Sequence, residues 1–210
     1  MQARERVLCV GVLAGTAVLA GCSVHVNKGG NGGEDKDVQI HVPFGNLQVH
    51  KNKSSAGDLG LPAYPGAVPE PDKDGDDDKS VDVQMGFGKW QMRVQVANYS
   101  TPDGQAKVQD FYRKALGRYG EVLACRGDEP VGSPARTGAG LTCKDTGDRG
   151  KFIHVTSDAK LELKAGSERR QHIVAFDNKG RPGTHFSLIS LMLPPSSHGD
   201  SGGNLGGEEE

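Results

Sequence analysis

The sequence has little material for a large hydrophobic core. Only 35% of its 210 residues are hydrophobic and 5% are aromatic, with a single tryptophan, whereas 31 residues are glycine. Much of the glycine and charge gathers in stretches that read as linkers and tails, such as residues 27–37 and 194–210. We therefore expect a packed domain clearly smaller than the chain length suggests.

Several motifs that carry chemistry are missing. The sequence holds no Gly-x-Ser-x-Gly elbow, no phosphate-binding loop and no His-Glu-x-x-His helix. With a net charge of −2 and no basic stripe, it lacks the features of a nucleic-acid binder. The acidic run from Asp72 to Asp78 fails as a calcium loop, because Asp77 and Val83 occupy the positions that need Gly and Glu. We expect a solvated linker there and no cofactor.

Long hydrophobic runs are also scarce, and the one that stands out begins the chain. Arg4 and Arg6 precede an uncharged run from Val7 to Ala20. A membrane-spanning helix needs about 20 apolar residues, so this run is short for that role. A basic start before an apolar run is instead typical of a secretory signal.

The residues after this run are Leu19-Ala20-Gly21-Cys22, which resemble the lipobox of bacterial lipoproteins at all four positions. In that family the signal is cut before the cysteine, which carries the lipid. The resemblance implies a signal peptide over residues 1–21 and lipidation of Cys22. One acyl chain holds a protein only marginally, so two or three should hold it almost permanently. The alternative is an ordinary signal peptide with a chance cysteine.

The lipoprotein interpretation also predicts a location. In the sorting rules of enteric lipoproteins, Ser23 after the cysteine sends the protein to the outer membrane. We therefore expect a lipid-anchored protein of the cell envelope, facing the periplasm, whose partners are the membrane and an envelope protein or glycan. The oligomeric state stays open.

The cysteines fit an exported protein. Cys9 leaves with the signal and Cys22 is lipidated, so Cys125 and Cys143 remain. An even pair in an oxidising compartment predicts a disulfide, which would contribute about 3 kcal/mol. The alternative is a metal or redox pair, although redox cysteines usually have two residues between them and here residues 126–142 intervene.

Composition divides the mature chain into three parts. Residues 22–60 are predicted to be a flexible tether with a small hairpin at 38–50, where Val38, Ile40, Leu47 and Val49 alternate around a turn. An isolated hairpin is marginal in water, so it must dock on the domain, pair with a partner or flicker. Residues 61–193 form the globular domain, and residues 194–210 a disordered tail.

The globular domain is predicted to be α+β. Alternation over residues 81–87 and, in the opposite phase, over 90–96 predicts two antiparallel strands. A helix follows, capped by Thr101 and ending at Gly120, and further strands are expected at 121–125, 152–156, 161–164, 172–176 and 185–193. We expect one helix on a mainly antiparallel sheet of five to seven strands, with the other face wet and available for binding.

Two more local expectations concern the core. The helix should bury one face at helical spacing, and Tyr64, between two prolines, should dock against the domain. The residues of the helix face are Val108, Phe111, Tyr112, Ala115, Leu116 and Tyr119.

Three hypotheses for function remain. The first is a non-enzymatic lipoprotein whose domain binds an envelope component. The second is a metal-dependent or histidine-based hydrolase, in which His154, His172 and His185 meet near Asp158 or Glu162, although the absence of a His-x-His or Glu-x-x-His spacing favours scattered surface histidines. The third is a domain with an apolar ligand cavity lined by Trp90, Phe111 and Leu188.

Short motifs also resemble a group of uncharacterised envelope proteins of acidobacterial-type genomes. They are Leu61-Pro62-Ala63-Tyr64-Pro65-Gly66-Ala67, the stretch Phe111–Leu116 with Tyr119-Gly120, and Gln171–Ala175. The resemblance covers residues 38–193 in outline. It implies no activity and no catalytic residues.

Overall fold

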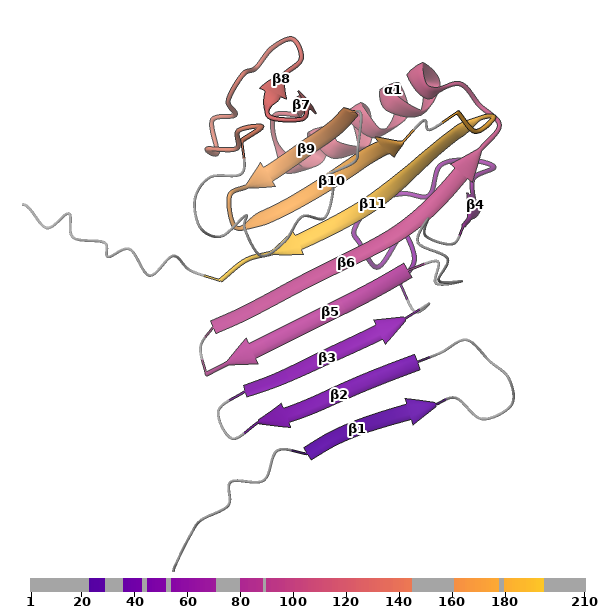
Figure 1. The fold of residues 1–210 in the computed structure, drawn as a ribbon. Helices are drawn as coiled ribbons and strands as arrows, with labels where there is room; N and C mark the ends of the chain where they lie inside the picture. The colour runs from indigo at the N-terminus through magenta and orange to yellow at the C-terminus, as the bar shows by residue number, and fades with distance from the viewer. Residues whose placement is uncertain are drawn as a thin grey trace, which may run out of the picture.

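A computed structural model describes residues 23–28, 36–42, 45–51, 54–70, 80–88, 90–144, 161–177 and 180–194. Within this part the chain forms one antiparallel sheet with a single α-helix on one side (Figure 1). The strands are β1 Ser23–Lys28, β2 Lys36–Val42, β3 Gly45–Lys51, β4 Val68–Pro69, β5 Ser80–Phe87, β6 Trp90–Thr101, β7 Leu123–Arg126, β8 Glu129–Pro130, β9 Leu161–Ser167, β10 Arg170–Asp177 and β11 Thr184–Met192.

The prediction of one helix on a sheet of five to seven strands is wrong, and the docking of the hairpin, which the sequence left open, is decided. The described residues form an 11-stranded sheet in the order β1-β2-β3-β5-β6-β11-β10-β9-β7-β8, with β4 paired to β6. The hairpin of β2 and β3 joins the sheet because β3 pairs with β5, which sets Val49 opposite Val83 and Leu47 opposite Met85. Pairing on both sides of β3 satisfies a ladder that an isolated hairpin leaves half open.

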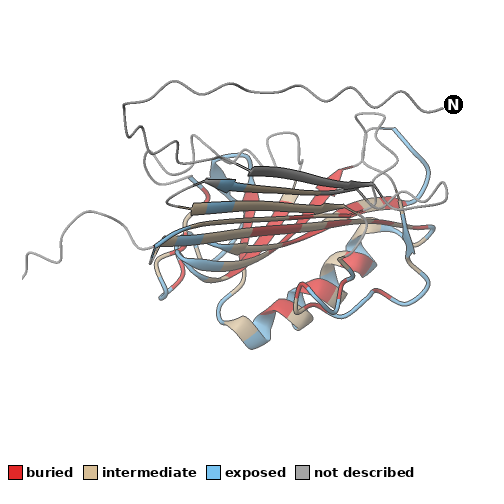
Figure 2. Ribbon diagram, turned by 90° about the horizontal axis from the view of Figure 1, so that it is seen from below, coloured by how far each residue is buried: buried red, intermediate tan, exposed pale blue. Residues whose placement is uncertain are grey.

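The main core lies between the helix and four neighbouring strands, which are β6, β11, β10 and β9 in sheet order. Helix α1 spans Gln105–Leu116 and continues into a 3-10 turn, η1, over Gly117–Tyr119. Val108, Tyr112 and Leu116 are fully buried, which confirms the predicted helix face. Figure 2 shows the helix against one side of the sheet, which we call the helix side; the other is the far side.

The start of the helix differs from the prediction. Thr101 does not cap it but ends β6, where it pairs with Thr184. The residue at the cap is Gly104, and no side chain of the described residues caps the helix with a hydrogen bond there. Thr101 Oγ1 instead accepts a hydrogen bond from the Asp103 amide at 3.4 Å. Thr101 therefore belongs to the sheet, although the local sequence predicts it as the helix cap.

The segment between β3 and β4 packs against the domain, as predicted for Tyr64. Its side chain is 4% exposed, and its hydroxyl donates to the Asp103 carboxylate at 2.7 Å. Its ring meets Phe111 edge to face, with 5.1 Å between ring centroids. Ala56 and Leu59 are buried in the same core, which therefore begins before residue 61.

The Cys125–Cys143 disulfide is present, which confirms the sequence prediction. Both cysteines are buried, and they pack with Leu123 and Leu141 in a small cluster. The bridge thus holds the long loop after β7 against the sheet.

Candidate functional site

The two sides of the sheet are identified by the register of β6. Ala97 and Tyr99 belong to the core under the helix, and successive strand residues point to opposite sides. Val96, Val94, Met92 and Trp90 therefore point to the far side. The same parity extends across the paired strands β5, β3 and β2, since cross-strand partners share a side.

On the far side, the rows of these four strands between Trp90 and Val96 carry mainly hydrophobic side chains, which we call the apolar face. Most paired rows join apolar partners, for example Val83 with Val49 and Val94, or Met85 with Leu47 and Met92, whereas the last row places Lys51 beside Val81. The side chains are mostly half-buried, and Phe87 is 46% exposed. The members are Val38, Ile40, Leu47, Val49, Val81, Val83, Met85, Phe87, Trp90, Met92, Val94 and Val96.

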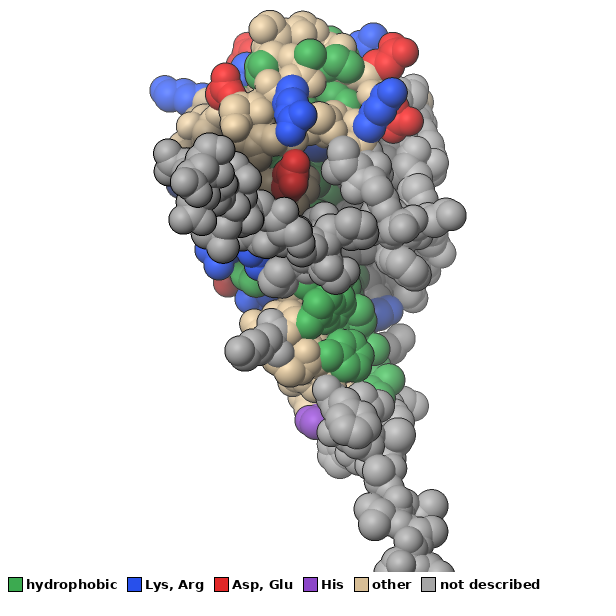
Figure 3. Space-filling model, turned by 90° about the vertical axis from the view of Figure 1, so that its left-hand side faces the viewer, with side chains coloured by type: hydrophobic (Ala, Val, Ile, Leu, Met, Phe, Trp, Pro, Cys, Tyr) green, Lys and Arg blue, Asp and Glu red, His purple; other side chains and the backbone are tan. Residues whose placement is uncertain are grey.

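An aromatic pair closes one end of the apolar face. Phe87 and Trp90 face each other across the β5–β6 turn with 5.7 Å between ring centroids. The Phe87 ring lies over Gly45 of β3, where a methyl group would overlap it. Glycine thus leaves room for the ring to pack on the strand backbone. Figure 3 looks onto these strand ends and shows hydrophobic side chains gathered along the lower part of the molecule.

The helix side of β2, β3 and β5, and of β6 up to Gln95, is polar. Gln48, Gln84 and Gln95 lie there, together with an ion pair in which Arg93 donates to Asp82 at 3.1 and 2.5 Å. The hydrogen bond to Asp82 raises the pKa of Arg93. The sheet therefore reverses its polarity: its helix side is apolar under the helix and polar beyond it. The prediction of a wet face opposite the helix is wrong for β2, β3, β5 and β6.

Farther along the far side, the apolar face continues into a buried cluster. Ile173, Ala175 and Ile189 are buried there and pack with Val96 of β6. Beyond them Lys164 and Glu162 form an ion pair at 3.0 Å, each side chain 8% exposed. The exposed portion of the far side thus lies at the end formed by the amino-terminal strands.

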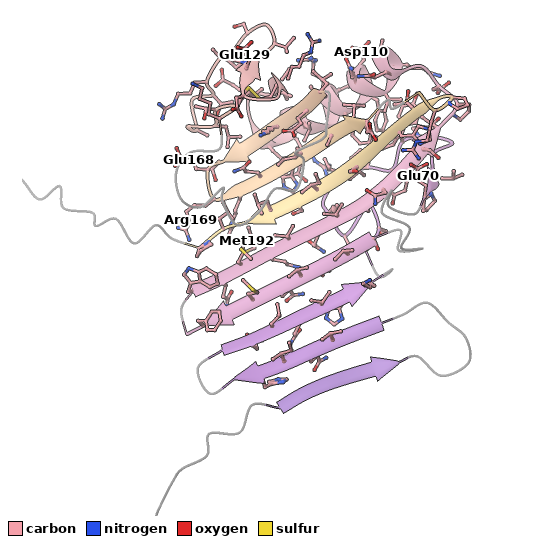
Figure 4. All side chains as sticks on the ribbon, viewed as in Figure 1. Glu70, Asp110, Glu129, Glu168, Arg169 and Met192 are labelled. Carbon is pink, nitrogen blue, oxygen red and sulfur yellow. A yellow bond between two sulfur atoms is a disulfide. The ribbon has the colours of Figure 1, made fainter. Side chains whose placement is uncertain are left out.

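His185 lies on the far side, at the other end of the strands from Trp90. Its Nδ1 contacts both oxygens of Glu70 at 2.9 Å, and its Nε2 lies 3.1 Å from the Pro182 carbonyl. Arg181 donates to the same carboxylate at 3.2 Å. Burial raises the pKa of Glu70, but the hydrogen bonds from His185 and Ser100 and the charge of Arg181 outweigh burial and lower it. Figure 4 labels Glu70 beside this strand end.

His172 lies on the helix side and is part of the core boundary. Its ring stacks on Tyr119 at 3.7 Å between centroids, and its Nδ1 donates to the Leu59 carbonyl at 3.0 Å. Burial lowers the pKa of His172, and the charge of Arg118 lowers it further. A neutral ring that fastens the Leu59 segment accounts for these contacts.

The structure does not bring His172 and His185 together. His172 pairs with Ser190 and His185 with Asp177, so the two rings lie on opposite sides of the sheet and about 17 Å apart along the strands. His154 and Asp158 lie outside the described residues. Glu162 is bonded to Lys164. Within the described ranges, no three His, Cys, Asp or Glu side chains are grouped to hold a metal ion.

The residues of the predicted apolar cavity are also separated. Phe111 and Leu188 lie in the core on the helix side, whereas Trp90 lies at the end of the apolar face on the far side. Among the described residues, no helix is both long and apolar enough to cross a membrane.

Sequence reasoning missed the apolar face although it found the alternation that builds it. The signal was that the hairpin and the strands after it both alternate with valine and leucine on one side and glutamine on the other. The two sets of hydrophobic side chains form one surface only because β3 pairs with β5, which is distant from it in the sequence. Comparison with protein-family models, with curated proteins and with solved structures gave no match to this chain.

Proposed function

We propose that the protein is a lipid-anchored lipoprotein of the bacterial cell envelope that binds an envelope component through the apolar face of its sheet. The anchor is Cys22 of the lipobox, and the role is binding rather than catalysis. One observation carries the binding role. Among the described residues, twelve hydrophobic side chains share one side of four neighbouring strands, while the other side of β2, β3 and β5, and of β6 up to Gln95, is polar.

A surface of this kind needs an apolar partner. Contiguous exposed hydrophobic patches of several hundred Å² on soluble domains usually mark interaction sites. The face suits a lipid or the apolar surface of a protein better than a strongly hydrated glycan, because burying its valines gains free energy only when water leaves both surfaces. The Cys125–Cys143 disulfide supports export, since such bonds persist mainly in oxidising compartments.

The proposal is tested by the intact mass of the full-length gene product extracted from membranes. Expected is the mass of a chain cut before Cys22 plus acyl chains, with a gain of about 2 Da when the disulfide is reduced. The matched variant Cys22→Ala should lose the acyl mass and remain uncut. An unacylated wild-type protein in the soluble fraction would overturn the anchor, and the envelope role with it.

A further inference from the structure

We infer that the apolar face rests on the lipid bilayer that holds Cys22. This inference depends on the lipid anchor proposed above, and it names the partner of the face as phospholipid. It begins with the place where the anchor meets the sheet. β1 starts at Ser23, the residue directly after Cys22, so only one Cα–Cα step of about 3.8 Å separates the two positions.

The register shows which end of the sheet the anchor approaches. Ser23 pairs with His41, His41 with Asn46, Asn46 with Gly86, and Gly86 with Gln91. This row is directly next to the row formed by Phe87 and Trp90. Four strand spacings, about 19 Å, separate Ser23 from Gln91. The anchor is therefore attached at the aromatic end of the apolar face.

The chemistry of that end suits a membrane surface. Tryptophan and other aromatic side chains favour the interface between lipid headgroups and hydrocarbon. Phe87 projects from the β5–β6 turn with 46% of its surface exposed, and Trp90 lies beside it. Behind them the face offers Met85, Met92 and Leu47, which are compatible with the acyl region.

The backbone of these strands also permits contact with lipid. Hydrocarbon offers no hydrogen bonds, so amides facing it must already be paired. Each strand of the apolar face has a partner on both sides: β2 lies between β1 and β3, β3 between β2 and β5, β5 between β3 and β6, and β6 between β5 and β11. Among the described strands, the four that form the face are therefore paired on both edges, and the sheet ends at β1 beside them.

The size of the face favours the bilayer over a second copy of the chain. Four strands, with about 20 Å from Phe87 to Val81, give a footprint of about 400 Å². A stable dimer usually needs about 800 Å² from each partner. An anchored protein needs far less, because its lipid makes docking an intramolecular step at high effective concentration.

The single tryptophan makes the inference testable. Acylated full-length protein is reconstituted in phosphatidylcholine vesicles whose acyl chains carry bromine, which quenches tryptophan on contact. Trp90 is the only tryptophan in the chain, so all of the signal comes from the apolar face. Expected are a blue-shifted emission and strong quenching, compared with vesicles of unbrominated lipid.

A pair of neighbouring residues supplies the matched control. Val49 and Gln48 follow each other in β3 on opposite sides of the sheet, and both are half-buried. Val49→Lys places a charge in the face and should lower the ratio of docked to free protein about tenfold. Gln48→Lys adds the same charge on the polar side and should leave quenching unchanged. Circular dichroism checks that both variants fold. The quenching of Trp90 in the wild-type protein tests the inference even if a variant fails to fold.

Each other outcome has one meaning. A blue-shifted but unquenched Trp90, with cross-linked dimers, would overturn the bilayer in favour of a second copy. An unquenched Trp90 that acrylamide reaches freely would show that nothing covers the face and would overturn the inference as well. Both results leave the anchor intact if the mass of the same sample shows acylation. Absence of acyl mass would instead reject the proposed function.

Discussion

His185 and Glu70 show what a single side chain gains from its position at a strand end. The ring has an oxygen acceptor on each nitrogen: the Glu70 carboxylate at 2.9 Å and the Pro182 carbonyl at 3.1 Å. Each ring nitrogen therefore lies within hydrogen-bond distance of an oxygen. Glu70 follows β4, and its amide donates to Asn98 of β6, so the pair fastens this segment to the end of the sheet. His172, a residue of the same type, fastens Leu59 from the other side.

The Glu70 contacts predict a pH dependence. The pKa of Glu70 in the folded protein is below its ordinary value of 4.5. Its contribution to stability is therefore fully present above about pH 4.5, and is lost as pH falls from there through the folded pKa. Glu70→Gln should lower the free energy of unfolding by about 1–2 kcal/mol near neutral pH and flatten the fall in acid. Urea unfolding at several pH values measures both effects.

A control for Glu70→Gln lies on the exposed surface. Glu129→Gln in β8 removes a carboxylate from an exposed position and should leave the pH profile close to that of the wild type. If Glu70→Gln gives the same acid slope as the wild-type protein, the pair with His185 does not contribute to stability.

At the scale of elements, the elements with strong local signals were predicted well. The helix face, the β5–β6 pair and the hairpin were found because side chains repeat at 3.6 or 2 residues. The start of the helix was not, since Thr101 satisfies the rules for a cap and also fits the register of β6. Local rules cannot decide whether Thr101 caps the helix or ends the strand, because the choice depends on its cross-strand partner Thr184.

The loop after β7 depends on its disulfide. It runs from Cys125 to Cys143, and most of its side chains between them are exposed. The double variant Cys125→Ala/Cys143→Ala should lower the free energy of unfolding by about 3 kcal/mol, because the open chain has more conformations to lose on folding. Urea unfolding measures the difference.

Chemical reduction of the wild-type protein is the companion measurement for this loop. It should produce a loss of stability close to that of the double variant without changing the sequence. An unchanged urea midpoint in both samples would mean that the loop is held by packing of Leu123 and Leu141 alone.

At the scale of the whole molecule, the two sides of one sheet are apolar over different strands. Its helix side is apolar where α1 covers β9, β10, β11 and part of β6, and polar across β5, β3 and β2. Its far side carries the apolar face on β2, β3, β5 and β6. The hydrophobic residues, 35% of the chain, are thus divided between the core under α1 and the apolar face.

The continuous sheet predicts the pattern of hydrogen exchange. β3 bonds to β2 and β5, so its amides exchange only when the sheet opens. Protection in Leu47 and Val49 should therefore approach that in the centre of β6. The two-residue strand β8, paired on one side, provides the contrast with fast exchange. Fast exchange throughout β3 with slow exchange in β6 would show a hairpin that does not belong to the sheet.

The sequence by itself determined most of the longer strands, the helix and its buried face, and the pairing of Cys125 with Cys143, because these follow from local periodicity and from the number of cysteines, but it did not reveal β1, β4 or β8. Only the tertiary structure decided that β3 pairs with β5, and therefore that the valines of both strands share one side. A shift of one residue would send every side chain of a strand to the other side. Register between distant segments depends on how the whole sheet packs, and this is why the apolar face emerges only from the folded chain.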